Sequence, residues 1–157
     1  MAWTSVFLCG LPLRPGQRRA RLRLMENNVA DLPLSKLRDS LLELHKTLVD
    51  MERASYEGAI GPIQSPNQFL QLLTNDPWFA WLRPLSQLIV EMDKAMEESE
   101  TVGPKEIQEL FRQARSLLVV SEEGEGFGRN YFEALQNAPD VVLAHAQVAR
   151  LLREPKK

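Results

Sequence analysis

Apolar residues recur every three or four positions between residues 34 and 51 of this 157-residue chain. The repeat consists of Leu34, Leu37, Leu41, Leu44, Leu48 and Met51. Because an α-helix completes a turn in about 3.6 residues, this spacing places all six side chains on one stripe. Leu42, Val49 and Tyr56 widen the stripe, and so broad a face is typical of a bundle helix rather than of a coiled-coil seam. The chain therefore has to bury a wide helical face against other helices.

Capping residues, prolines and glycines predict where the helices begin and end. Ser35 and Asp39 predict the start of the first helix, and Gly58 with Gly61-Pro62 predicts its end. Later starts are predicted where a proline follows a turn or cap residue, at Ser65-Pro66, Asp76-Pro77, Gly103-Pro104 and Ala138-Pro139. A glycine-rich turn over residues 121–128 is followed by another short helix, expected over residues 129–136.

The composition favours helices over strands throughout. The chain has 25 Leu against 18 Val, Ile and Thr together, and no segment alternates apolar and polar residues as a half-buried strand does. The predicted fold is all-α, a compact antiparallel bundle of five or six helices joined by short connections. Pro84 lies inside the helix expected from Trp78 to Met96, where it cannot bond the Ala80 carbonyl, so a kink is predicted there.

The first 24 residues differ in charge from the rest of the chain. They hold five arginines and no acidic residue, whereas the remainder holds 14 basic and 21 acidic residues and has a formal charge of −7. Met25 opens a polar sequence typical of a natural start. We therefore predict two parts: residues 1–24 as a disordered arm or an N-terminal extension outside the fold, and residues 25–157 as a single helical domain.

Several classes of protein are excluded or disfavoured by the composition. No apolar run reaches the length of about 20 residues that a membrane span needs, and no Cys and His residues have the spacing of a zinc site. The acidic body disfavours binding to nucleic acid. These features lead us to expect a protein that has no membrane or nucleic-acid partner and needs no cofactor.

The two histidines are the first candidates for a metal site in the bundle core. Di-iron bundles use Glu-x-x-His pairs, but Leu42 and Val142 stand three residues before His45 and His145. The simpler expectation is a partly buried histidine bonded to a neighbouring helix. The alternative is a metal held by His45 and His145 together with Glu52 or Glu91, if their helices lie side by side.

Catalytic motifs are missing from the sequence. Gly124-Glu125-Gly126-Phe127-Gly128 resembles the glycine-rich loop of protein kinases, but its third glycine comes one residue early and its acids would repel phosphate. No Gly-x-Ser-x-Gly elbow occurs, and Cys9 has no histidine near it in sequence. We therefore expect a hinge at the glycine-rich loop and no enzymatic activity.

An aromatic segment over residues 76–84 is the strongest candidate for a binding surface. Trp78, Phe79 and Trp81 cover a wider arc of the expected helix than one contact face requires. Either this helix lies centrally and is covered on several sides, or part of the arc stays exposed to a partner, as aromatic and arginine side chains are common anchors of interfaces. In the second case Trp78, Phe79, Trp81 and Arg83 would form the partner site.

Three segments carry a resemblance to known sequences: the run from Asp76 to Val90, the loop 124–128 and the segment from Pro139 to His145. With them the chain resembles a family of small all-helical bacterial proteins with no assigned activity, over about residues 34–153. The resemblance implies a bacterial cytoplasmic location and supplies no catalytic residues.

The leading functional hypothesis is a non-enzymatic helical bundle that acts through protein–protein interaction or self-association, including a homodimer. The alternative is a protein that binds a small apolar ligand or a metal in the bundle core, near His45 and His145.

Overall fold

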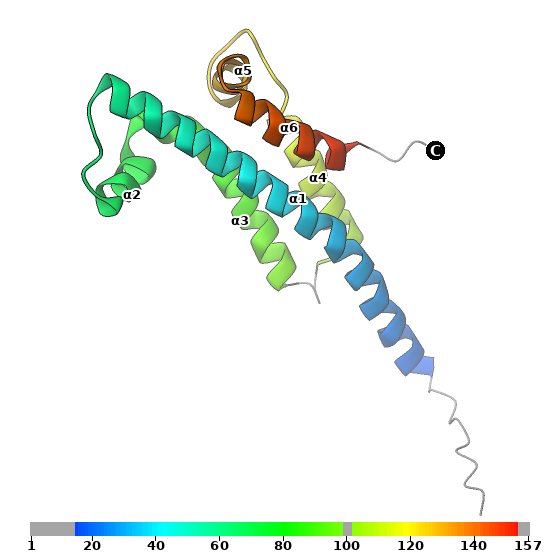
Figure 1. The fold of residues 1–157 in the computed structure, drawn as a ribbon. Helices are drawn as coiled ribbons and strands as arrows, with labels where there is room; N and C mark the ends of the chain where they lie inside the picture. Colours follow the sequence, from blue (N-terminus) through cyan, green and yellow to red (C-terminus); the bar gives the residue numbers. More distant parts are fainter. Residues whose placement is uncertain (1–14, 99–101, 154–157) are drawn as a thin grey trace, which may run out of the picture.

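The computed structural model describes residues 15–98 and 102–153, and the side-chain environments of residues 33–98 and 102–153. This part of the chain forms six α-helices, one 3-10 helix and no strand (Figure 1). The elements are α1 (Pro15–Ala59), α2 (Pro66–Asn75), η1 (Pro77–Leu82), α3 (Arg83–Glu97), α4 (Pro104–Leu117), α5 (Phe127–Asn137) and α6 (Pro139–Leu152). The predicted all-α class is therefore confirmed. None of the described helices combines the length and apolar character that a membrane crossing needs.

Prolines mark the first turns of most of these helices, as the sequence predicts. Proline suits this position because its missing N–H would have no partner inside the helix. At α2 the Ser65 hydroxyl accepts the Gln68 amide at 3.1 Å, and the Gln68 side chain reaches back to the Gln64 amide at 2.7 Å. At α4 the Glu106 carboxylate accepts the Gly103 amide at 3.0 Å. These helix starts therefore depend on hydrogen bonds between residues close together in the sequence.

The interruption expected at Pro84 takes the form of a change of helix type. The segment predicted as one helix consists of η1 followed by α3, with Pro84 in the first turn of α3. The Arg83 amide bonds the Ala80 carbonyl in place of the amide that Pro84 lacks. The chain thus tightens into a 3-10 turn just before the proline and begins a new α-helix there.

Helix α1 begins 20 residues before its predicted start at Ser35. It runs from Pro15 through Pro33 to Ala59, a length of 45 residues, because residues 20–26 are mostly strong helix formers. The predicted boundary at Met25 does not coincide with the end of an element. Residues 15–24 are helical rather than a disordered arm, and residues 1–14 lie outside the described residues. That residues 1–24 do not contribute to the stability of the domain stays a prediction.

Helix α1 forms the centre of the bundle and contacts α3, α4, α6 and η1. Its apolar stripe is fully buried over Leu34, Leu37, Leu41, Leu44 and Leu48. Arg38 donates to both carboxylate oxygens of Asp93, at 2.6 and 3.2 Å, and His45 bonds Ser86 at 2.7 Å. As residue numbers rise along α1 they fall along α3, so the two helices are antiparallel. The upstream half of α1 projects beyond the other helices (Figure 1).

Candidate functional site

The predicted partner surface on η1 is largely covered. Phe79 is only 1% exposed, and its ring lies 5.7 Å from that of Tyr56. Its predicted role as a partner contact is therefore wrong, because η1 packs against α1 and α2 and turns Phe79 into the core. Trp78 is half-buried, with its ring edge against Tyr56 at 5.7 Å. The helix is thus covered on several sides, which was the first of the two interpretations.

Trp81 and Arg83 retain partial access to solvent. Trp81 is half-buried against the ring of Phe127 on α5, with the ring centroids 5.5 Å apart. Arg83 is exposed, and its guanidinium donates to the Thr74 carbonyl at 2.8 Å. The partner-binding role of Trp78, Trp81 and Arg83 stays a prediction.

Glu52 on α1 forms a hydrogen bond with the aromatic segment on η1. Its carboxylate accepts the Trp78 indole N–H at 2.7 Å. Burial raises the pKa of the Glu52 carboxyl above its ordinary value, and hydrogen bonds from Trp78 and Trp81 oppose that rise. The carboxylate is therefore bound by neutral donors, and no ion pair to it occurs among the described residues.

His45 on α1 faces the hydroxyl of Ser86 on α3, with 2.7 Å between Nε2 and Oγ. Ser86 also contacts the carbonyl of Leu82 at 3.4 Å. Burial lowers the pKa of His45, so the neutral imidazole is favoured. This serine–histidine distance is the distance that a nucleophile and its base require. Within the described residues no hydrogen bond orients Nδ1 of His45, so the third member of a catalytic triad is missing there.

His145 on α6 bonds Tyr131 on α5, with 2.7 Å between Nδ1 and the phenol oxygen. Tyr131 is fully buried and stacks on Phe127 at 5.3 Å. Burial lowers the pKa of His145 and raises that of Tyr131. Both histidines are thus half-buried and bonded to a neighbouring helix, which is the simpler of the two predicted outcomes.

The metal site considered from the sequence does not form. Glu52 bonds Trp78, His45 bonds Ser86, and His145 bonds a tyrosine on another helix. No group of three or more His, Cys, Asp or Glu side chains suited to a metal occurs within residues 33–98 and 102–153. The three residues are separated because α3 and η1 cover one side of α1, whereas His145 turns toward α5.

A groove between α1 and α6 is a further candidate site. Its volume is about 620 Å³. The residues that line it, called the acidic groove below, are Glu43, Thr47, Asp50, Met51, Ala138, Asp140, Val141, Leu143, Ala144 and Gln147. The two helices lie side by side (Figure 1). The groove therefore has one wall from each of two packed helices.

A smaller cavity adjoins the acidic groove at Met51, which lines both. This cavity of about 310 Å³ lies between α1 and α5 and is lined by Met51, Glu52, Ser55, Asn130, Glu133, Ala134 and Asn137. Its lining ends at Asn137, next to Ala138 of the groove. The two hollows together follow α1 from Glu43 to Ser55, a length of about 18 Å at 1.5 Å per residue.

The lining of both hollows is acidic on an apolar floor. Glu43, Asp50 and Asp140 stand on the walls of the groove, and none of the described residues that line either hollow is lysine or arginine. Lys46 follows Glu43 on α1 but forms no ion pair with the described acids of the groove. Glu133 in the smaller cavity is paired with Arg129 at 2.9 Å. The groove acids are thus open to a cation from outside.

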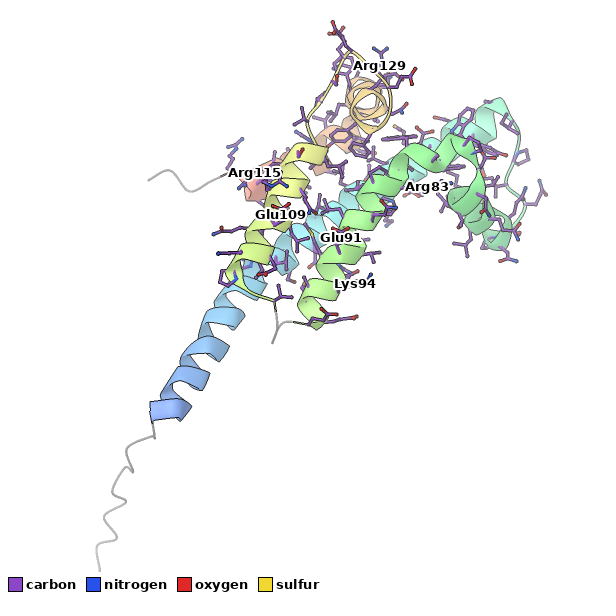
Figure 2. All side chains as sticks on the ribbon, turned by 180° about the vertical axis from the view of Figure 1, so that it is seen from behind. Arg83, Glu91, Lys94, Glu109, Arg115 and Arg129 are labelled. Carbon is purple, nitrogen blue, oxygen red and sulfur yellow. The ribbon has the colours of Figure 1, made fainter. Side chains whose placement is uncertain are left out.

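The opposite face of the molecule lacks this uniform charge. A cavity of about 510 Å³ between α3 and α4 is lined by lysines as well as acids, including Lys94 and Lys105 beside Glu91 and Glu109. Figure 2, which views the molecule from behind, labels Glu91 and Lys94 on α3 and Glu109 on α4. Charges of both signs on one surface favour no particular sign in a ligand.

The sequence reasoning missed the groove because no single segment contains it. The signal on α1 is the row Glu43, Thr47 and Asp50, whose spacing of four and three residues puts them on one side of the helix. Asp140 lies 90 residues later, and only the packing of α6 on α1 brings it to the same groove. Glu52, a metal candidate in the sequence, proves to lie in the adjoining cavity.

No protein-family model, curated protein or solved structure matches the chain. A functional proposal therefore depends on the groove and the side chains around it.

Proposed function

We propose that this protein is a non-catalytic helical bundle that acts through protein contacts and binds a basic, amphipathic segment of a partner in the acidic groove. The observation that carries the proposal is the lining of the groove, which places acids from two helices around an apolar floor and, among the described residues, no basic side chain. A segment with apolar side chains on one face and basic side chains beside them complements both properties.

The apolar floor supports binding as well as charge. Leu143 is 65% exposed, and Met51, which also lines the groove, is half-buried. Covering an exposed leucine completely is worth about 1.5 to 3 kcal/mol. Exposed ion pairs contribute about 0.2 to 1 kcal/mol each and weaken with salt. The floor would therefore supply most of the affinity, and the acids would select the sign of the partner's charge.

The surroundings of the histidines support a non-catalytic role. Each histidine is bonded to a hydroxyl of the neighbouring helix, and neither lines the acidic groove or the cavity that adjoins it. A proton carrier at the groove would have to come from its carboxylates or from the partner. Contact between proteins needs no such group.

Fluorescence anisotropy tests the proposal with a labelled peptide of about four helical turns, built from leucine on one face and arginine on the other. The wild-type chain is expected to bind it and to reject the same peptide with glutamate in place of arginine. Glu43→Lys with Asp50→Lys should weaken binding by at least about tenfold, since two attractive charges become repulsive.

The matched control is Glu91→Lys with Glu125→Lys, which changes the net charge equally at exposed positions outside the groove. Trp81→Ala serves as a second control for the aromatic segment. Equal binding of the basic and acidic peptides, or equal losses in the two double-lysine variants, would contradict the proposal. Loss of peptide binding in Trp81→Ala alone would place the binding site at η1 instead of the acidic groove.

A further inference from the structure

The N-terminal part of α1 has the chemistry that the acidic groove complements. Residues 15–25 hold four arginines, Arg18, Arg19, Arg21 and Arg23, and no acidic residue. Leu22, Leu24 and Met25 supply apolar side chains in the same segment. The chain from Met25 onward is acidic overall, with a formal charge of −7. One molecule therefore contains both a basic helical segment and an acidic groove.

Helix geometry keeps this segment away from the groove of its own chain. Arg23 and Glu43 belong to one uninterrupted helix and are 20 residues apart. At a rise of 1.5 Å per residue, about 30 Å of helix separates them. Arg18 is farther still, and the upstream half of α1 points away from the bundle (Figure 1). The segment can reach a groove of this kind only on another molecule.

We propose that the acidic groove of one copy binds residues 15–25 of a second copy, so that the protein self-associates through α1. The inference rests on the proposed function and names its partner. The dimensions agree, since eleven helical residues extend about 16 Å and the hollows along α1 extend about 18 Å. Arginine is suited to the walls because its guanidinium pairs with carboxylates in a bidentate geometry.

A charge-swap experiment on the full chain tests this inference by sedimentation velocity. One variant carries Arg→Glu at positions 18, 19, 21 and 23, and the other carries Glu43→Lys with Asp50→Lys. The wild-type chain is expected to associate and to dissociate as salt rises from about 50 mM to about 500 mM, because screening weakens exposed pairs. Each variant alone should associate at least about tenfold more weakly.

An equimolar mixture of the two variants should associate again, since the glutamate segment meets the lysine groove and the arginine segment meets the acidic groove. Far-ultraviolet circular dichroism checks that both variants keep the helical content of the wild type. If the glutamates lower it, Arg→Gln at the same four positions removes the charge without repulsion and should still weaken association. The control pair Glu91→Lys and Glu125→Lys should associate as the wild type does.

Three results would overturn the inference: a wild-type chain that stays monomeric, variants that associate as tightly as the wild type, or a mixture that does not associate. The peptide experiment separates this failure from failure of the proposed function. If the basic peptide binds the groove while the chain stays monomeric, the partner is another protein and the groove proposal stands. If neither the peptide nor the second copy binds, both proposals fail.

Discussion

Replacing Glu52 by glutamine should stabilise the protein at neutral pH, although it removes a charge that receives a hydrogen bond. Burial raises the pKa of the Glu52 carboxyl above its ordinary value of 4.5, and the indole donors of Trp78 and Trp81 do not cancel the effect. The ionised carboxylate is therefore less favourable in the folded chain than in the unfolded chain. Glutamine removes that penalty and keeps an oxygen that can accept the Trp78 N–H.

The size of the hydrogen-bond contribution follows from a comparison with Glu52→Ala. A hydrogen bond to a charged group is worth about 1.5 to 3 kcal/mol, and a neutral one about 0.5 to 1.5 kcal/mol. The site is half-buried, so water replaces part of a lost bond. We expect Glu52→Gln to exceed Glu52→Ala by about 1 kcal/mol in free energy of unfolding, or about 2 to 4 °C in melting temperature for a chain of this size.

Urea unfolding at several pH values measures these differences. For an acid whose pKa is raised in the folded state, folding binds protons between the two pKa values, so stability falls as pH rises through that window. The advantage of Glu52→Gln over the wild type should be absent below the unfolded pKa of about 4.5 and should grow to a plateau above the raised pKa. Asp50→Asn, an exposed neighbour on the same helix, should change stability little. A wild type more stable than Glu52→Gln at pH 7, by a margin that grows with pH, would refute the reasoning.

Three further predictions concern the core and the histidines. Leu44→Ala should lower the free energy of unfolding by about 2 to 5 kcal/mol, and Leu42→Ala on the same helix by less than about 1 kcal/mol, because Leu44 is fully buried and Leu42 is 42% exposed. Equal losses in chemical denaturation would contradict this difference in burial. Tyr131→Phe should lower the free energy of unfolding by about 1 kcal/mol, because it removes the hydroxyl bonded to His145. Equal melting temperatures of the variant and the wild type would show that this hydrogen bond does not contribute to stability. Because burial lowers the pKa of His45 and His145, the free energy of unfolding should fall as pH drops below about 6.5, the pKa of an unfolded histidine. Replacing both histidines by glutamine should flatten the dependence of stability on pH below that value. An unchanged slope in the double variant would contradict this prediction.

Local patterns predicted the elements of this fold well. The leucines of α1 that recur every three or four residues are buried, whereas Leu42, which was predicted to widen the stripe, is 42% exposed. Prolines with their caps mark the starts of α2, η1, α4 and α6. These features depend on neighbours within about four residues, so the sequence contains all the information needed. The upstream extent of α1 was not predicted, because Ser35 and Asp39 were interpreted as the start of the helix, whereas α1 begins at Pro15.

The candidate site was much less predictable, because its properties come from the packing of separate helices. The metal candidates illustrate the difficulty. His45 and His145 each lie on an apolar helix face, and only the structure shows that they turn to Ser86 and Tyr131. Phe79 is a residue type common at protein interfaces, yet the short 3-10 helix η1 directs its side chain into the core.

Methyl NMR of the methionines tests the central claim, binding in the acidic groove, most directly. Met51 lines both the groove and the adjoining cavity, Met92 is fully buried in the core, and Met96 lies on α3. When the basic peptide is added to chain labelled with ¹³C-methyl methionine, the Met51 resonance, assigned with Met51→Leu, should shift while those of Met92 and Met96 stay in place. A shift at Met96 with Met51 unchanged would contradict the account.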